Sequence, residues 1–417
     1  MKLPRRALVL GLARSGQAAA LALVRRGVPT VGVDRADDLD TGRLAEAGVE
    51  LHLGTEEEGL LDDVELLIKS PGVPGESPLA TAAQARGIPI WSEIELGFRL
   101  LGNPFIGITG TNGKTTTTEL LGAIFRAAGR PIEVAGNVGR PLTAVEPESD
   151  DAWIVCELSS FQLEDIHELR PRVAVLLNLE PDHLDRHGTF EAYGEAKLRI
   201  FENQGGDDVA VVPRGFGPVP GEARRIEFAG DDPLPTEPRI PGAHNRENAA
   251  AATAAARAAG IPDAAIATGL REFPGVPHRL ELVAEAGGVR FVNDSKATNV
   301  AAALRSLATY AGEPLHLILG GSLKGEDFGP LARAIPASVK GIHLVGEASD
   351  ELDAALRATG HEAARDETLP RAVGAAWSQA APGDVILLAP ACASFDQYKN
   401  FEERGDDFRR LAEELAS

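Results

Sequence analysis

Short runs of β-branched and aliphatic residues alternate with stretches rich in Ala, Leu, Glu and Arg along most of this 417-residue chain. Because these runs are apolar throughout, they predict strands buried on both faces, and the stretches between them predict helices that cover the strands. The sequence therefore predicts an α/β protein built from parallel sheets. The runs occupy residues 7–10, 30–33, 66–70, 105–109, 153–157, 173–178, 315–319 and 384–389.

Two breaks interrupt this alternation. The first is Gly102-Asn103-Pro104, which ends a helix-like segment just before a new apolar run, and the second is the turn-forming stretch Phe273-Pro-Gly-Val-Pro277. A chain of this length is expected to contain about two to three domains. We predict domains at residues 1–93, 94–276 and 277–417.

The charge balance limits the possible ligands. With 41 Lys and Arg against 62 Asp and Glu, the formal charge is -21, a field that disfavours nucleic acid and anionic lipid as partners. No run approaches the ~18 apolar residues of a membrane span, and Arg14 interrupts the N-terminal apolar run, so we expect no membrane insertion and a cytoplasmic location. Cys156 and Cys392 lie in apolar runs, which predicts buried thiols.

The first predicted strand leads into a glycine-containing turn, Gly11-Leu-Ala-Arg-Ser-Gly16, and then into an alanine-rich helix. The turn is one residue short of the dinucleotide-binding pattern, because Ala13 stands where a second glycine would let a diphosphate approach the backbone. Asp34, at the end of the next predicted strand, is spaced to meet a ribose hydroxyl. The turn favours a diphosphate at the helix N-terminus, and a tight turn without a ligand is the alternative.

A second glycine-containing loop, Gly110-Thr-Asn-Gly-Lys-Thr-Thr116, follows another apolar run and precedes a helix expected to begin near Thr117. It departs from the phosphate-binding loop pattern at one position, since Ile108 stands in place of the first glycine. The pattern predicts that backbone N–H groups cradle the phosphates of a nucleoside triphosphate. Lys114 is expected to reach the β- and γ-phosphates, and Thr115 to bind Mg²⁺.

Further polar residues follow other predicted strands. Glu157 closes one apolar run and is a candidate Mg²⁺ ligand. His183 and His187 follow another run, where a site and an exposed loop explain them equally well. Because the carboxyl ends of parallel strands meet at one edge of a sheet, polar segments in the last third of the chain predict a ligand crevice. These segments are residues 293–299, 320–324 and 391–397.

Taken together, these segments resemble the Mur ligase family over essentially the whole chain. The loop Ile-Thr-Gly-Thr-Asn-Gly-Lys-Thr-Thr at 108–116 is similar to that of several Mur ligases and of folylpolyglutamate synthases. Three more selective tracts resemble the members that add D-glutamate: Glu-Leu-Ser-Ser-Phe-Gln-Leu-Glu at 157–164, Asp-Ser-Lys-Ala-Thr-Asn at 294–299 and Ala-Cys-Ala-Ser-Phe-Asp-Gln at 391–397. The Asp-Asn-Pro-Arg loop expected of relatives that add diaminopimelate or lysine is absent from the sequence.

The resemblance implies a Rossmann-like N-terminal domain, a central P-loop ATPase-like domain and a Rossmann-like C-terminal domain. It implies catalytic roles for Lys114, His183 and Lys197, with Lys197 carried as a carbamate whose oxygens suit a magnesium ion. The implied UDP-sugar ligands are Arg14, Ser15, Asp34, Arg35, Ser70, Gly72 and Asn137. The implied ATP ligands are Gly110, Thr111, Asn112, Gly113, Lys114, Thr115, Thr116, Asn245, Asn248, Arg279 and Asp294. The implied Mg²⁺ ligands are Thr115, Glu157, His183 and Lys197, and the implied D-glutamate ligands are Thr298, Lys324, Ser394 and Phe401. Arg14 is a departure, since a small or apolar residue is expected there.

The implied reaction joins D-glutamate to UDP-N-acetylmuramoyl-L-alanine at the expense of ATP, through an acyl phosphate and a tetrahedral intermediate, in a monomeric enzyme. A nicotinamide oxidoreductase built on the turn at 11–16 and Asp34 is the rival reaction class, but it leaves the phosphate loop without a role. A nucleotide-switched binding protein or transport ATPase is the other rival, for which the sequence offers no membrane-facing segment and no recognisable partner surface.

Overall fold

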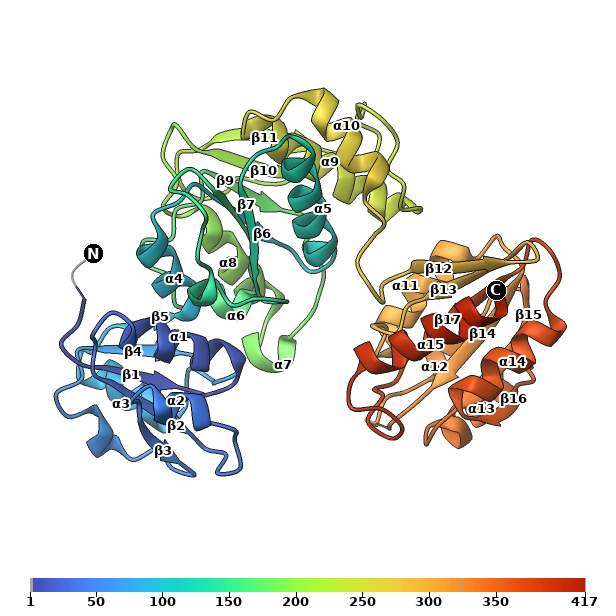
Figure 1. Ribbon diagram of the computed structural model, residues 1–417, viewed down its shortest axis with the longest axis horizontal. Coiled ribbons are helices and arrows are strands. Elements are labelled where there is room, and N and C mark those ends of the chain that lie inside the picture. The colour runs from blue at the N-terminus through green and yellow to red at the C-terminus, as the bar shows by residue number, and fades with distance from the viewer. Residues whose placement is uncertain (1–2, 324, 417) are drawn as a thin grey trace. The chain divides into compact units, whose positions relative to one another are not determined.

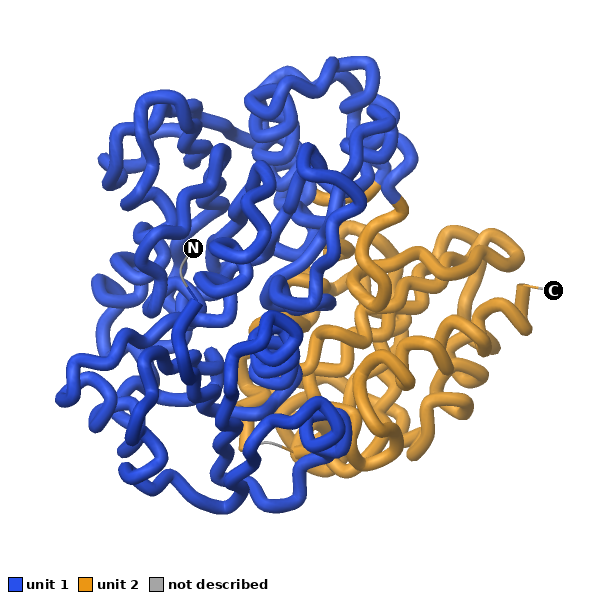
Figure 2. Tube along the Cα trace, turned by 60° about the vertical axis from the view of Figure 1, so that its left-hand side comes forward, with its two compact units in different colours: residues 1–239, 243–273 blue, residues 240–242, 274–417 orange. Residues whose placement is uncertain are grey.

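The computed structural model describes residues 3–323 and 325–416, and the chain divides into two compact units. The first unit comprises residues 1–239 and 243–273, and the second comprises residues 240–242 and 274–417 (Figure 2). The first unit contains two sheets, here called sheets A and B, and the second contains sheet C (Figure 1). The predicted α/β class is confirmed, while the three domain boundaries stay a prediction.

Sheet A is a five-stranded parallel sheet with the order β3-β2-β1-β4-β5. Its strands are β1 (Ala7–Leu10), β2 (Thr30–Asp34), β3 (Glu50–Leu53), β4 (Leu66–Lys69) and β5 (Ile90–Ser92). Its helical elements are α1 (Arg14–Val24), α2 (Gly42–Glu46), η1 (Glu58–Leu61), α3 (Pro78–Ala85) and α4 (Glu93–Leu101). Alternate residues of β1 point into two cores: Ala7 and Val9 pack with α1, and Leu8 and Leu10 pack with α3. Burial on both faces explains why β1 is apolar throughout.

Sheet B is a six-stranded parallel sheet with the order β11-β10-β9-β6-β8-β7. Its strands are β6 (Phe105–Thr109), β7 (Ile132–Gly136), β8 (Trp153–Glu157), β9 (Val173–Leu176), β10 (Val209–Pro213) and β11 (Arg224–Phe228). The helical elements are α5 (Lys114–Ala127), η2 (Leu142–Ala144), α6 (Ser160–Leu163), α7 (Leu184–His187), α8 (Phe190–Leu198), η3 (Arg199–Phe201), α9 (Ala243–Ala258) and α10 (Asp263–Glu272). The central strand β6 lies between β8 and β9, so the segments that follow these three strands meet at one edge of the sheet.

Sheet C has six strands in the order β12-β13-β17-β14-β15-β16. Its strands are β12 (Glu281–Ala286), β13 (Val289–Asn293), β14 (Leu315–Gly320), β15 (Val339–Val345), β16 (Ala364–Glu367) and β17 (Val385–Leu388). The helices α11 (Val300–Tyr310), α12 (Gly329–Arg333) and α13 (Ser349–Ala358) pack on one face, and α14 (Leu369–Gln379) and α15 (Phe401–Ala416) pack on the other.

One strand of sheet C corrects the prediction of purely parallel sheets. β12 runs antiparallel to β13, and the two are joined by Gly287 and Gly288 alone. Both glycines have positive φ angles, 53° and 79°, which is the backbone of a two-residue hairpin turn. So short a connection can join only antiparallel strands, so sheet C is mixed.

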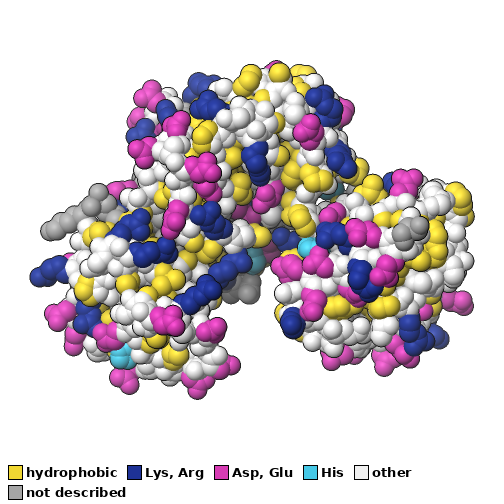
Figure 3. All heavy atoms as spheres, viewed as in Figure 1, with side chains coloured by type: hydrophobic (Ala, Val, Ile, Leu, Met, Phe, Trp, Pro, Cys, Tyr) yellow, Lys and Arg dark blue, Asp and Glu magenta, His cyan; other side chains and the backbone are white. Residues whose placement is uncertain are grey.

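The surface carries both signs of charge. In Figure 3, acidic and basic side chains are interspersed over the visible face, so the net charge of -21 is not gathered there into one acidic surface. Both cysteines are buried and free, as predicted. Among the helices of the described chain, none combines the length and the apolar character needed to cross a membrane.

Candidate active site

The loop after β6 is shaped by two glycines. Gly113 has a φ of 84° and is the N-cap of α5, and a Cβ atom at this position would lie 2.2 Å from the side-chain oxygen of Asn248. The helix begins at Lys114 rather than near Thr117, because the left-handed Gly113 lets it start directly after the loop. The N–H groups at the N-terminus of α5 belong to Lys114, Thr115 and Thr116, and a helix N-terminus of this kind suits a phosphate ligand.

Two lysines converge on this loop. Lys114 Nζ donates hydrogen bonds to the carbonyl oxygens of Gly110 and Thr111, both at 3.0 Å. Lys197 Nζ, from α8, donates to the same Gly110 oxygen at 2.8 Å. Lys197 is 2% exposed, and its burial together with the charge of Lys114 lowers the pKa of its amine to about 7. The structure thus places a buried lysine, easily deprotonated, beside the phosphate loop.

Side chains that follow β9 hold the loop in place. Asn178 Oδ1 accepts a hydrogen bond from the backbone N–H of Asn112 at 2.8 Å, and the Asn178 amide donates to the Asn112 carbonyl at 3.2 Å. The Tyr193 hydroxyl lies 3.0 Å from the Thr111 hydroxyl. The loop is therefore braced from two directions before any ligand binds, which limits the entropy lost on binding.

Glu157 ends β8 at the same sheet edge and is 2% exposed. Its Oε1 accepts a hydrogen bond from the Asn137 amide at 2.9 Å. Its Oε2 is buried and has no hydrogen-bond partner among the described residues. A buried carboxylate oxygen without a donor is costly unless a cation or ligand group meets it. The structure groups Asn137 with Glu157, and the predicted UDP-sugar role of Asn137 stays a prediction.

The two histidines after β9 lie in different environments. His183 has a left-handed backbone, with a φ of 51°, and its side chain is 49% exposed. The His187 ring stacks on Phe161 at 5.3 Å, and its Nε2 lies 3.0 Å from the Ser160 hydroxyl. His187 is thus a packed residue that positions α7, whereas His183 presents its ring to solvent near the Phe161 ring, 4.9 Å away.

The glycine turn after β1 is closed by polar side chains of neighbouring strands. The two oxygens of Asp34 accept hydrogen bonds from the backbone N–H groups of Leu12 and Ala36, at 2.6 and 2.9 Å. The Ser70 hydroxyl donates to the Gly11 carbonyl at 2.6 Å. Asp34 therefore shapes the turn itself, and its predicted contact with a ribose stays a prediction.

The other predicted UDP-sugar ligands of sheet A lie around this turn. Arg14 and Ser15 begin α1, and Arg14 is exposed, so its charge is accommodated in solvent. Arg35 forms an ion pair with Glu56. Gly72 lies in the exposed loop after β4. The site is thus a turn at the carboxyl ends of β1, β2 and β4, which is the expected place for a ligand in such a sheet.

A basic side chain from α7 links this turn to sheet B. Arg186 donates to the carbonyl oxygens of Pro71 and Val73, each at 3.1 Å, and to the Glu164 carboxylate at 3.1 Å. Lys69, 3% exposed, lies 3.0 Å from Asp165. The loop after β4 is therefore held to the segment that carries His183, so the two predicted binding sites of the first unit are structurally connected.

In the second unit, three of the predicted residues, Asp294, Thr298 and Ser394, lie on loops that follow β13 and β17. Asp294 is 5% exposed and accepts hydrogen bonds from Ser306 and from the Leu280 backbone N–H. Burial raises the pKa of Asp294, against the effects of the Ser306 hydrogen bond and the Arg279 charge. The remaining predicted ligands of this unit are Thr298, half-buried, Ser394, buried, Phe401, at the start of α15, and Lys324, which lies outside the described residues.

Comparison with known proteins decides the family. Residues 5–92 match the Mur ligase MurD-like N-terminal domain, 108–215 the Mur ligase middle domain, and 278–392 the Mur ligase glutamate ligase domain. The chain is 43% identical to the UDP-N-acetylmuramoylalanine--D-glutamate ligase of Pelotomaculum thermopropionicum, over 98% of this chain and 97% of that one. It is 44% identical to the protein of the same name from Gloeobacter violaceus, over 98% and 99%. The chain belongs to the Mur ligase family.

Solved structures agree on the fold. The UDP-N-acetylmuramate-alanine ligase MurC of Thermotoga maritima superposes with a TM-score of 0.61 at 19% identity, over 98% of this chain and 99% of that one. MurF of Acinetobacter baumannii gives 0.56 at 17% identity, over 98% and 93%. The predictions of the Mur ligase family and of a ligase are confirmed, and the individual residue roles stay predictions.

Sequence reasoning missed one buried cation of this Mur ligase. Arg404, on α15, is 2% exposed. Its guanidinium donates to the backbone oxygens of Cys392, Ala393 and Ser295 at 3.1, 3.0 and 2.9 Å, and its Nε lies 3.0 Å from the Ser295 hydroxyl. Burial lowers the pKa of Arg404 to about 10. Its guanidinium also lies 3.4 Å from the backbone oxygen of Gly320, so Arg404 joins all three polar segments of sheet C, at 293–299, 320–324 and 391–397.

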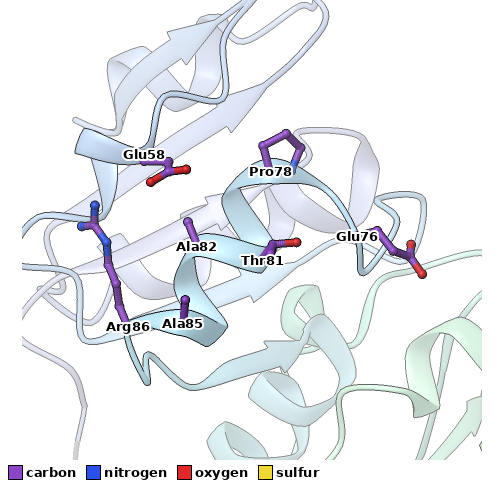
Figure 4. Close-up of a pocket in the computed structure, with 7 residues that line it drawn as sticks. All are labelled: Glu58, Glu76, Pro78, Thr81, Ala82, Ala85 and Arg86. Carbon is purple, nitrogen blue, oxygen red and sulfur yellow. The ribbon is translucent and has the colours of Figure 1, made fainter.

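A surface pocket of this Mur ligase lies apart from the predicted residues. It measures about 510 Å³ and opens between η1 and α3. Figure 4 shows its lining residues, Glu58, Glu76, Pro78, Thr81, Ala82, Ala85 and Arg86. None of them is a predicted UDP-sugar ligand, so this pocket is not the predicted nucleotide site.

Proposed function

We propose that this Mur ligase joins D-glutamate to UDP-N-acetylmuramoyl-L-alanine at the expense of ATP, which is converted to ADP and phosphate. The observation that carries the proposal is the edge of sheet B, where Lys114, Lys197 and Glu157 gather around a phosphate loop. Such an edge suits activation of a carboxylate by phosphoryl transfer. The substrates follow from the curated relatives and from the tracts at 157–164, 294–299 and 391–397.

Amide formation from a carboxylate requires a better leaving group than oxide. The alanine carboxylate attacks the γ-phosphorus of ATP, ADP leaves, and an acyl phosphate forms. The amine of D-glutamate then attacks the acyl carbon, loses a proton, and phosphate leaves the tetrahedral intermediate. Lys114 and the N–H groups at the start of α5 stabilise the charge of the transferring phosphoryl group.

The residues at this edge fit a magnesium ion. Mg²⁺ takes oxygen ligands and keeps several waters and substrate phosphates, and the buried, unpartnered Oε2 of Glu157 and the Thr115 hydroxyl are oxygens of this kind. The described part of the chain contains no group of three or more His, Cys, Asp or Glu that could hold a metal ion, so nucleotide phosphates and water would have to supply further ligands. We propose that Thr115, Glu157 and His183 hold the ion, which neutralises phosphate charge when bound.

We also propose that Lys197 carries a carbamate. Among the described residues, no carboxylate lies within ion-pair distance of Lys197, although its side chain is buried. The neutral amine would attack carbon dioxide, forming an N–C bond and releasing one proton to solvent, and the product bears a negative charge on two oxygens. The carbamate would then face the cation of Lys114 and could join the magnesium ligands.

The remaining sites are proposed from the resemblance of their sequence segments to the Mur ligase family. We propose that the turn after β1, with Arg14, Ser15, Asp34, Arg35, Ser70 and Gly72, binds the UDP-sugar. We propose that Asn245, Asn248, Arg279 and Asp294 are ATP ligands, and that Thr298, Lys324, Ser394 and Phe401 are D-glutamate ligands. We further propose a monomer that acts in the cytoplasm, where ATP is available.

Release of phosphate from ATP tests this function. With purified full-length protein and Mg²⁺, phosphate release should require both UDP-N-acetylmuramoyl-L-alanine and D-glutamate, and omission of either should reduce it to background. The matched control is the Lys114→Ala variant, which should release none under any condition. Phosphate release that is independent of both substrates would sink the ligase assignment.

A further inference from the structure

β14 and β15 each place one buried histidine on the face of sheet C that α14 covers. His316 and His343 have side chains that are 2% and 1% exposed, and their ring centroids are 6.4 Å apart. His316 is the second residue of β14, so it lies at the end of that strand away from the polar loop that follows Gly320. The pair is therefore separate from every site residue described above.

Each imidazole is oriented by a carboxylate. His316 Nε2 lies 3.3 Å from Asp384 Oδ2, and His343 Nδ1 lies 2.8 Å from Asp366 Oδ2. Because a carboxylate only accepts, each of these ring nitrogens carries the hydrogen, and the opposite nitrogen presents a lone pair. Those two atoms, His316 Nδ1 and His343 Nε2, are buried and lack a hydrogen-bond partner in the described chain. Buried acceptors without a donor require an explanation.

The two lone pairs point toward one space, which a glycine leaves open. A Cβ atom on Gly341 would lie 3.0 Å from His316 Nδ1, 3.3 Å from His343 Nε2 and 3.5 Å from the amide oxygen of Gln379. Gln379 ends α14 and is exposed, so the space lies next to solvent. Three electron-pair donors thus surround one point, and no described residue supplies a hydrogen to the two nitrogens.

We propose that this group, the His316–His343 site, binds a divalent transition-metal ion such as Zn²⁺ through the two imidazole nitrogens and the Gln379 amide oxygen. Water would complete a tetrahedral coordination. A carboxylate behind each ligating histidine is the usual arrangement at such sites. Nitrogen ligands favour Zn²⁺, Co²⁺ or Ni²⁺ over Mg²⁺, so this ion would differ from that of the ATP site.

The surrounding charges are compatible with a cation. Asp384 and Asp366 contribute two negative charges, and Lys340, 2.7 Å from Asp384, contributes one positive charge. Burial lowers the pKa of His316, which keeps its imidazole in the neutral form that binds metal. A bound ion would connect β14, β15 and the end of α14, and it would stabilise the second unit without taking part in ligation.

Cobalt uptake tests the proposal, because Co²⁺ reports imidazole coordination by its visible absorption. Full-length protein stripped with a chelator is titrated with Co²⁺ and Zn²⁺ in excess Mg²⁺, which occupies sites made of oxygen ligands. The wild-type protein is expected to bind one equivalent with an imidazole-type spectrum, and Zn²⁺ should raise its melting temperature. His343→Gln should abolish both effects.

Gly341→Ala keeps every ligand but puts a methyl group between them. Its affinity for Co²⁺ and Zn²⁺ should therefore fall at least tenfold, on the order expected for a disturbed metal site. Gly374→Ala, on α14 with open space around its Cα, is the matched control and should bind as wild type does. If His343→Gln fails to fold, Gly341→Ala and Gln379→Ala still decide the question. Equal uptake by wild type and Gly341→Ala, or none by wild type, would overturn the proposal and leave a water molecule as the partner of the two nitrogens.

Discussion

The side-chain nitrogen of Lys197 and that of Lys114 share one acceptor, the carbonyl oxygen of Gly110, at 2.8 and 3.0 Å. Two ammonium groups on one oxygen repel each other, and burial of Lys197 strengthens the repulsion because water screens it poorly. Conversion of Lys197 to a carbamate would replace this repulsion with an attraction to Lys114. The arrangement is therefore easiest to understand if Lys197 works in its modified form.

Replacement of Lys197 by alanine tests that form. We expect turnover by Lys197→Ala to fall on the order of 100-fold, as for loss of a group that supports a metal site, and to recover in part when formate or acetate is added. Lys340→Ala, in the second unit, is the control and should show no response to these anions. Full activity of Lys197→Ala without added carboxylate would remove the proposed role.

The shape of the phosphate loop predicts the effect of a single methyl group. In Gly113→Ala the Cβ would meet Asn248 Oδ1 at 2.2 Å, and the φ of 84° is unfavourable for alanine. We expect ATP affinity, measured by calorimetry, to fall at least tenfold. Gly129→Ala also has a positive φ, 63°, but open space around it, so it should lose some stability and retain ATP binding. Equal effects of the two variants on ATP affinity would contradict the predicted role of the loop.

The contacts of Arg404 lead us to expect that the polar loops of sheet C depend on its guanidinium. Arg404→Lys keeps the charge but cannot serve every acceptor that the guanidinium reaches, so buried carbonyl oxygens lose their donors. We expect a loss of about 3 kcal/mol in unfolding free energy and a higher KM for D-glutamate. Arg410→Lys, on the same helix with a 53% exposed side chain, is the control. A fully stable Arg404→Lys with unchanged KM would show that the loops do not depend on this contact.

The burial of Glu93 should make the free energy of unfolding depend on pH. It is fully buried, and burial raises its pKa from 4.5 to about 6, although the Thr143 N–H and hydroxyl both donate to Oε1 at 2.6 Å. Between pH 4.5 and 6 the folded state keeps a proton that the unfolded state releases, so this group's contribution to stability falls as pH rises through that window. The loss amounts to about 2 kcal/mol by pH 7.

The Glu93→Gln variant has no carboxyl group to titrate at this position. The difference in unfolding free energy between the variant and wild type, measured by urea unfolding at each pH, should therefore shift in favour of the variant by about 2 kcal/mol between pH 4.5 and pH 7. Glu58→Gln, at an exposed position, should keep a constant difference from wild type. A constant difference for Glu93→Gln as well would mean that its pKa is not raised.

Much of the fold could be predicted because its strands are buried on both faces. Each apolar run of the sequence forms a strand, and the loop at 110–116 lies between β6 and α5. The hairpin at Gly287-Gly288 was missed although the dipeptide is a turn signal, because β12 is mostly half-buried and its residues do not form an apolar run. Its pairing depends on the turn rather than on burial.

The site was harder to predict because burial is decided by tertiary contacts. Arg404 lies among acidic residues of an amphipathic helix, a pattern that indicates a solvated arginine, and only the packed loops reveal its role. Lys197 was identified by resemblance alone, since a sequence does not show that a lysine is 2% exposed. The partner of Asn137, Glu157, was likewise unpredictable, because it comes from a neighbouring strand.

The most direct test of the central claim is a competition between amino acids, in which the mass of the product shows which amine the enzyme has joined to the UDP-sugar. The purified protein is incubated with ATP, Mg²⁺ and UDP-N-acetylmuramoyl-L-alanine in an equimolar mixture of D-glutamate, L-glutamate, D-aspartate, L-lysine and meso-diaminopimelate. The products are identified by mass spectrometry after chiral separation. We predict one product, the D-glutamate adduct, with ADP and phosphate formed in equal amounts. A lysine or diaminopimelate adduct, or ADP formed without any amide, would contradict the account.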